Sequence, residues 1–108
     1  MFPSLWYEQF AITPLEAMAL GVPVLVSDVA RSGTVIENGV TGRFFPSGDP
    51  AALASALRDL LSDPAALRRM GDAARAAFEA SDCRPDRNLA RLLSVYASAR
   101  GDGIRKVK

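Results

Sequence analysis

The sequence has no histidine and a single cysteine, Cys83. Without histidine, neither a Ser-His-Asp triad nor a Cys-His pair can form, and the usual zinc ligand sets cannot be assembled. One cysteine excludes an intramolecular disulfide, so we interpret Cys83 as a partly buried structural thiol at a helix junction. We therefore expect neither a metal site nor a cofactor.

The chain also lacks an excess of charge and a long apolar run. Its 13 basic and 12 acidic residues give a net charge of +1, which offers no electrostatic case for nucleic acid or an anionic membrane as partner. No apolar run approaches the roughly 18 residues of a membrane helix, and no signal peptide is recognisable, so we expect no transmembrane segment and a cytoplasmic location. A length of 108 residues allows one domain at most.

The most informative stretch is residues 4–27, where Glu8 and Glu16 stand with seven residues between them. Thr13 and Pro14 predict a helix start, with Thr13 as the cap, Pro14 at the first helical position and Glu16 as the acid of a capping box. One alternative is that Glu16 has no role beyond this capping box. Glu8 could equally be a solvated loop carboxylate, and the neighbouring aromatic residues could belong to the core: Trp6, Tyr7 and Phe10.

This helix is expected to run to Leu20 and to stop at a left-handed Gly21, before a strand over 24–26 that is buried on both faces. Loops that lead into helices of a parallel α/β sheet lie at the carboxyl ends of the strands, where such sheets bind ligands. A site is therefore predicted near residues 8–16. Free backbone N–H groups of the first helical turn attract an anion, and the candidate donors are Ile12, Thr13 and Leu15.

The remaining chain reads as scaffold. We expect Thr34 to cap a short helix over 35–37, a turn at Asn38-Gly39 and a strand over 42–45 beside the first. Asp-Pro pairs start two helices, and a last helix covers about 85–99. The residues predicted to face inward are Leu53, Ala56, Leu57, Leu60, Leu61, Leu67, Met70, Ala74 and Phe78, with Leu89, Leu92, Leu93 and Tyr96 on one side of the last helix; Arg68, Arg69 and Arg75 are predicted to be solvated.

Two segments, PSLWYEQFAITPLEAMALGVPV and VIENGVTGR, closely resemble the nucleotide-sugar-binding signature of retaining glycosyltransferases with the GT-B fold, the family-four type. The paired glutamates are its hallmark, and the resemblance spans roughly residues 3–97. It implies an α/β fold, a Rossmann-like three-layer half domain truncated at its N-terminal side. Residues 1–100 would be the C-terminal nucleotide-sugar-binding part, and 101–108 a flexible tail.

The resemblance implies transfer of a hexose from GDP- or UDP-hexose to a carbohydrate or other hydroxyl acceptor, with retention of configuration. Glu16 would hydrogen-bond the ribose of the nucleotide, and Glu8 would hold hydroxyls of the hexose near the reaction centre. Backbone groups of the intervening stretch would meet the hexose and the diphosphate. The implied catalytic residues are Glu8 and Glu16, and the implied donor-binding residues are Glu8, Phe10, Ala11, Ile12, Thr13, Leu15 and Glu16.

The chain departs from the family pattern in three places. Gln9 and Ala11 stand where glycines often flank the phenylalanine of the family pattern, and Thr34 replaces an acid of that pattern. The family's basic pair and its N-terminal half are missing, so this chain alone is expected to be inactive. Two alternatives stay open: a non-catalytic nucleotide-binding or interaction fragment, and a GT-B nucleotide-sugar epimerase. The sequence does not identify the base, the sugar or the acceptor.

Overall fold

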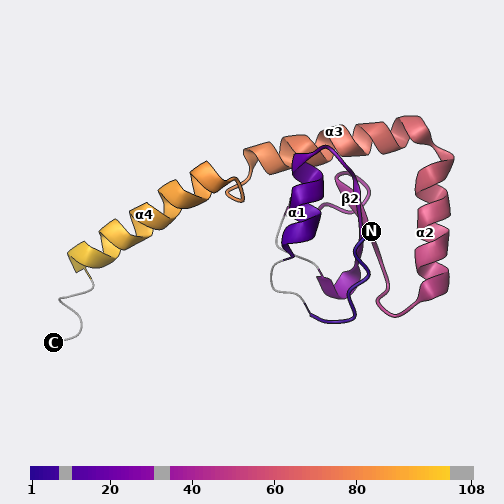
Figure 1. Ribbon diagram of the computed structural model, residues 1–108, viewed down its shortest axis with the longest axis horizontal. Coiled ribbons are helices and arrows are strands. Elements are labelled where there is room, and N and C mark those ends of the chain that lie inside the picture. The colour runs from indigo at the N-terminus through magenta and orange to yellow at the C-terminus, as the bar shows by residue number, and fades with distance from the viewer. Residues whose placement is uncertain (8–10, 31–34, 103–108) are drawn as a thin grey trace.

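The computed structural model describes residues 1–7, 11–30 and 35–102. The elements, in chain order, are α1 (Ile12–Ala19), β1 (Val24–Ser27), the 3-10 turn η1 (Asp28–Ala30), β2 (Gly42–Phe45), α2 (Pro50–Ser62), α3 (Pro64–Ala80) and α4 (Pro85–Asp102). Figure 1 shows α1 and α2 on opposite sides of the strands and α3 across one end of them. The predicted α/β class with helices on both faces of a parallel sheet is confirmed.

β1 and β2 pair in parallel, with Val24 opposite Gly42 and Ser27 opposite Phe45. Val24, Leu25 and Val26 are buried, as the apolar run predicts, and β1 continues one residue further to Ser27, which is also buried. One face of the sheet packs on α1 through a cluster that includes Leu15, Met18, Val24, Val26 and Ala74, and the other packs on α2 through Leu25, Phe45 and Ala56. This alternation along β1 is the reason that the whole strand is buried.

Each strand also has a hydrogen-bond partner on its outer side. Phe2 lies beside β1, where its N–H donates to the Leu25 carbonyl at 2.8 Å and its carbonyl accepts from the Ser27 N–H at 3.1 Å. Along β2, the Phe44 N–H donates to Oδ1 of Asn38 at 2.9 Å. The outer edges of both strands are therefore occupied at these positions.

The start of α1 differs from the prediction. The helix begins at Ile12 with Ala11 as its N-cap, and no side chain caps it, so the proposed cap at Thr13 and the capping box with Glu16 are wrong. Pro14 sits in the third helical position, not the first. The physical reason is that none of the first three positions of a helix has an intrahelical acceptor for its N–H, so proline marks the first turn without fixing the residue.

The left-handed stop at Gly21 agrees with the prediction, although α1 ends at Ala19, one residue before the predicted end at Leu20. Gly21 has φ of +72°, its N–H donates to the Met18 carbonyl, and the N–H of Val22 donates to the Ala17 carbonyl, both at 2.9 Å. These two bonds form the Schellman arrangement that a left-handed residue permits. The chain is thus turned sharply from α1 into β1.

The helix predicted over 35–37 is not formed at Ile36 and Glu37. The hydroxyl of the buried Thr41 accepts from the Glu37 N–H at 2.7 Å and donates to the Val35 carbonyl at 3.3 Å, which holds this segment as a turn. Its predicted cap, Thr34, lies outside the described residues. The Asn38-Gly39 turn is confirmed, with φ of +82° at Gly39.

α2 and α3 start as the Asp-Pro pairs predict. The side chain of Asp49 accepts from the Ala52 N–H at 2.9 Å, and that of Asp63 accepts from the Ala66 N–H at 3.0 Å. The predicted inward face of α2 is only partly buried, since the side chains of Leu57 and Leu61 are 37% and 62% exposed. A groove of about 370 Å³ lies there, called the leucine groove below, and its lining is Met1, Val22, Pro23, Leu25, Leu57, Leu60, Leu61 and Leu67.

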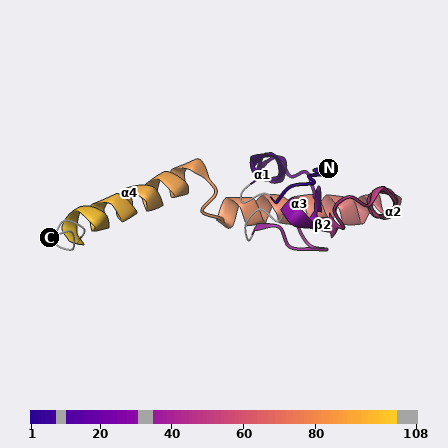
Figure 2. The ribbon, with the colours of Figure 1, turned by 90° about the horizontal axis from the view of Figure 1, so that it is seen from below.

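α4 projects away from the other elements, as Figures 1 and 2 show. The helix extends to Asp102, three residues past its predicted end. Its predicted apolar side is exposed, with Leu89 at 55% and Tyr96 at 61%, and among the described residues α4 adds nothing to either core cluster. Half-buried Cys83, just before it, packs against the first cluster, which agrees with a structural thiol. In the described part of the chain, no helix combines the length and apolar character needed to cross a membrane.

Candidate functional site

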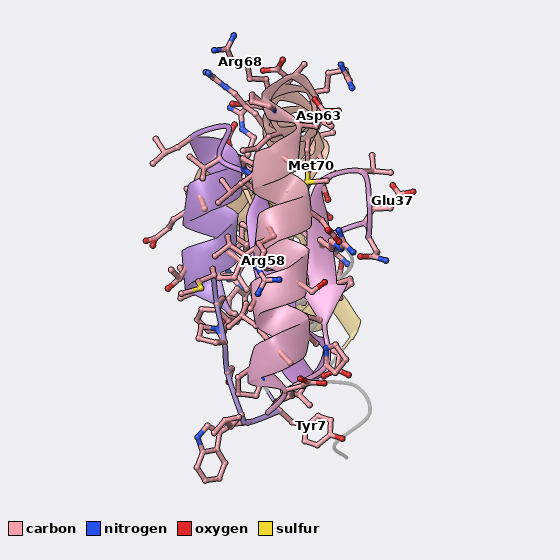
Figure 3. All side chains as sticks on the ribbon, turned by 90° about the vertical axis from the view of Figure 1, so that its right-hand side faces the viewer. Tyr7, Glu37, Arg58, Asp63, Arg68 and Met70 are labelled. Atoms are coloured by element: carbon pink, nitrogen blue, oxygen red, sulfur yellow. The ribbon has the colours of Figure 1, made fainter. Side chains whose placement is uncertain are left out.

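The carboxyl edge of the two strands is the candidate site, because parallel α/β sheets bind ligands at that edge. Four segments meet there: 4–7, the N-terminus of α1, the η1 turn after β1, and the turn at 46–49 after β2. Figure 3 places Tyr7 at one end of the molecule and Asp63 and Arg68 at the other. The exposed Arg68 is therefore far from this edge, which agrees with the solvated role predicted for it.

One backbone carbonyl joins three of these segments. The Ser4 carbonyl accepts from the Ser27 hydroxyl at 2.8 Å and from the Ser47 hydroxyl at 3.0 Å. Ser47 is itself held, because its N–H donates to Oδ1 of Asp28 at 2.9 Å. Ser27 is fully buried, so its hydroxyl is a satisfied polar group inside the fold and not a surface contact.

Three consecutive apolar side chains follow Ser4 and point outward. Leu5, Trp6 and Tyr7 are 70%, 79% and 90% exposed. The interpretation of Trp6 and Tyr7 as core aromatics is therefore wrong, and Phe10, the third aromatic considered, lies outside the described residues. The exposed stretch gives the edge an aromatic border at the point where the chain approaches Glu8.

The N-terminus of α1 faces the same edge. Ala11 is 3% exposed and precedes the helix with extended backbone angles, which anchors the end of the segment that began at Ser4. Ile12 and Thr13 occupy the first two helical positions, whose N–H groups have no acceptor within a helix. Leu15 differs: its position is the first whose N–H bonds back along the helix, and its side chain is core.

Glu16 lies in the second turn of α1 with an exposed side chain. No described residue forms a hydrogen bond or an ion pair with its carboxylate. Since the capping box is not formed, the structure gives Glu16 no structural task within the described residues. The other predicted acid, Glu8, and its neighbours Gln9 and Phe10 lie outside the described residues, so the pairing of the two glutamates is not tested.

A separate cavity lies near the carboxyl end of α3. It measures about 530 Å³ and is lined by residues that include Glu37, Cys83 and Arg91. The positively charged residue in its lining, Arg91, forms an ion pair with Asp82. Because this cavity is not at the carboxyl ends of the strands, where parallel sheets bind ligands, we place the candidate site at the carboxyl edge.

Beside this cavity, Arg84 makes ion pairs with Glu79 at 2.7 Å and with Asp86 at 3.0 Å. The hydrogen bond from Arg84 holds the pKa of Asp86 below its ordinary value, and the same bond raises the pKa of Arg84. In residues 1–7, 11–30 and 35–102, no group of three or more side chains could hold a metal ion.

Sequence reasoning missed the serines of this edge. Ser27 is the last residue of β1 and Ser47 is the second residue after β2. The signal was available: a hydroxyl residue at or just after the end of each of two parallel strands falls at the shared carboxyl edge. What the sequence did not show is that both hydroxyls meet one carbonyl.

Residues 1–77 match the family described as Glycosyl transferases group 1. The chain is 38% identical over its full length to the D-inositol 3-phosphate glycosyltransferase of Streptomyces coelicolor, covering 23% of that protein. It is 44% identical over 69 residues, or 64% of its length, to the glycogen synthase of Mycobacterium tuberculosis, covering 17% of that protein.

A solved structure is also similar. The sucrose-phosphate synthase of Thermosynechococcus elongatus matches 88% of this chain with a TM-score of 0.80 and 32% identity, over 24% of that structure's chain. The chain thus spans about a quarter of the length of the glycosyltransferase and of the solved structure that it matches.

Proposed function

Because this chain belongs to the glycosyl transferases group 1 family, we propose that it carries the donor-binding part of a glycosyltransferase. In this proposal a hexose passes from GDP- or UDP-hexose to a hydroxyl acceptor with retention of configuration. The observation that carries the proposal is that the family match, residues 1–77, includes both glutamates and the whole carboxyl edge.

Glu16 binds the nucleotide in this proposal. Its carboxylate is exposed on α1 and has no partner among the described residues, so it is available to accept hydrogen bonds from the ribose hydroxyls. The first turn of α1 contributes the N–H groups of Ile12 and Thr13, and the helix dipole favours the negative charge of a diphosphate at that end.

Glu8 acts on the sugar. It directly follows Tyr7 in the segment that leads to α1, so it precedes the nucleotide-binding helix by a few residues of chain. Its carboxylate would hold hydroxyls of the hexose while the bond to the diphosphate breaks. Donors aimed at the charge that develops on the leaving diphosphate would supply the main stabilisation, and no protein-derived acid is required beyond the phosphate itself.

In this proposal, residues outside this chain complete the binding of the acceptor and of the diphosphate. A second half of a GT-B fold would provide the acceptor wall and the basic residues that clamp the diphosphate. No cofactor or metal is part of the proposed reaction, and a cytoplasmic location remains the expectation.

The test is a chimera. The segment of the Streptomyces coelicolor glycosyltransferase that aligns with this chain is replaced by residues 1–108, and the relative's own transfer reaction is assayed. We expect measurable transfer. Glu16→Gln should then weaken nucleotide binding by about 1–3 kcal/mol, the range for a hydrogen bond to a charged group. Glu8→Gln should lower transfer while the affinity for the bare nucleoside diphosphate stays nearly unchanged.

Glu37→Gln is the matched control, because Figure 3 places Glu37 toward the end of the molecule opposite Tyr7 and it lines the large cavity. It should change neither binding nor transfer. A loss of donor binding in Glu37→Gln, with normal Glu16→Gln, would move the site to that cavity. An inactive but well-folded chimera would contradict the donor-binding role.

The second candidate is a non-catalytic interaction chain. The observation in its favour is the leucine groove, where Leu61 is 62% exposed and Val22 is 51% exposed. An apolar surface of this kind is typical of an interface. Titration of the 108-residue chain with GDP- and UDP-sugars by calorimetry distinguishes the two: heat of binding favours the first candidate.

A further inference from the structure

The Ser4 carbonyl is a junction that ties the candidate site to both strands. It accepts two hydroxyl hydrogen bonds, one from Ser27 at the end of β1 and one from Ser47 after β2. These three residues are 23 and 43 positions apart in the sequence and meet only because parallel strands end at one edge. A surface loop would normally satisfy such a carbonyl with water, so two protein donors indicate a fixed position.

The junction continues into the exposed segment. Ser4 Oγ accepts from the Trp6 N–H and donates to the Trp6 carbonyl, both at 3.2 Å. The Ser4 residue is thus held through its carbonyl and in turn holds Trp6 through its side chain. Glu8 follows two residues later, and the next described residue, Ala11, is buried. The chain between the two anchors carries the proposed sugar-binding acid.

We propose that Ser27 and Ser47 are positioning residues for the sugar-binding side of the site. Their hydroxyls fix the Ser4 carbonyl and so hold residues 4–7, which directly precede Glu8 in the sequence, whereas Glu16 is held independently by α1. This inference rests on the proposed function for its consequence in transfer, but the anchoring itself does not.

The anchoring is measurable in the 108-residue chain because Trp6 is its single tryptophan. Trp6 is 79% exposed, so quenching by solutes is already near its limit and motion is the informative quantity. We expect the fluorescence anisotropy of Trp6 to fall in Ser47→Ala and to fall further in Ser27→Ala combined with Ser47→Ala. Ser47→Thr keeps the hydroxyl and should retain the parent anisotropy.

Ser62→Ala is the matched control. Like Ser47→Ala, it removes a hydrogen bond from a serine hydroxyl to a backbone carbonyl. This bond runs from Ser62 to the Asp59 carbonyl at 2.7 Å, on α2 and away from the edge. Its Trp6 anisotropy should equal that of the parent. Ser47 is only half-buried, so Ser47→Ala keeps the test valid if the change at the fully buried Ser27 prevents folding.

In the chimera described above, Ser47→Ala should lower kcat by roughly tenfold to a hundredfold, the scale expected for a misplaced reacting group. The inhibition constant of the bare nucleoside diphosphate should change less than about twofold, since Glu16 is unaffected. Ser47→Thr should recover the rate. Unchanged anisotropy in the Ala variants, equal loss for the Thr variant, or a parallel rise in the inhibition constant would each overturn the inference. If Glu8→Gln has no effect while the anisotropy falls as expected, the proposed function fails and the anchoring stands.

Discussion

The contact between α3 and the end of α1 leaves no room for a side chain at Gly71. A Cβ on Gly71 would lie 2.3 Å from the Gly21 carbonyl oxygen and 3.3 Å from Cδ of Pro23. The oxygen cannot simply move away, because Gly21 is fixed in the left-handed turn by its bond to Met18. We therefore predict that Gly71→Ala destabilises the fold although it places alanine in a helix interior.

Two effects of opposite sign decide the magnitude. Alanine in a helix interior is favoured over glycine by about 1 kcal/mol. Overpacking typically costs about 1–3 kcal/mol, and this contact belongs at the upper end because the oxygen that must retreat, by roughly 0.7 Å to reach 3.0 Å, is a backbone atom. The net loss is about 2 kcal/mol, which corresponds to a fall in Tm of roughly 10 °C for a domain of this size.

The assay is thermal unfolding followed by circular dichroism, with two control glycines. A Cβ on Gly101 in α4 meets nothing within 4 Å, so Gly101→Ala should not lower the Tm. A Cβ on Gly39 also meets nothing, but φ there is +82°, so Gly39→Ala should cost about 1–2 kcal/mol through backbone strain alone. A Gly71→Ala protein as stable as the parent would refute the close-contact argument.

The remaining predictions concern a cap, a pH dependence and the isolated chain. Asp63→Ala should lower the free energy of unfolding by about 1 kcal/mol in denaturant titration, because the bond to the Ala66 N–H is lost, whereas Asp63→Asn should cost little. The hydrogen bond from Arg84 lowers the pKa of Asp86 in the folded protein. The stabilisation that this bond gives the fold is therefore complete above the ordinary pKa of 3.8, and it disappears as the pH falls through the lower pKa of the folded state. The Tm difference between the parent and Asp86→Asn should therefore be constant above about pH 4 and shrink below it; a difference that grows in acid would contradict the assignment. The 108-residue chain alone should transfer no sugar, since near-attack geometry for both substrates needs an acceptor wall. It should also self-associate through the leucine groove. Turnover by a chain whose mass in light scattering is that of a monomer would contradict both expectations.

The sequence predicted elements wherever a local signal carried the information. Asp49 and Asp63 each precede proline, and both act as caps because the capping bond spans only three residues. Gly21 was equally predictable, since few other residues adopt its φ without strain. The start of α1 was mislocated because proline is tolerated at any of its first three positions, and the buried Ala11, not a polar cap, precedes the helix.

Nonlocal features were beyond that reasoning. The junction at Ser4 depends on hydroxyls from two strands, and no spacing in the sequence shows that they converge. The apolar spacing in α4 was also correctly seen, but Leu89 and Leu93 are exposed. Periodicity gives the face of a helix and not what covers it, because the partner surface is a property of the assembled fold.

The projecting α4 changes how the chain will behave hydrodynamically. The radius of gyration is 17.5 Å, whereas a compact chain of this length has about 13 Å. An extended monomer elutes from a gel-filtration column earlier than a globular standard of equal mass. A single 108-residue chain would thus be mistaken for a dimer by elution volume, so a mass measurement that does not depend on shape, such as light scattering, is needed to tell the two apart.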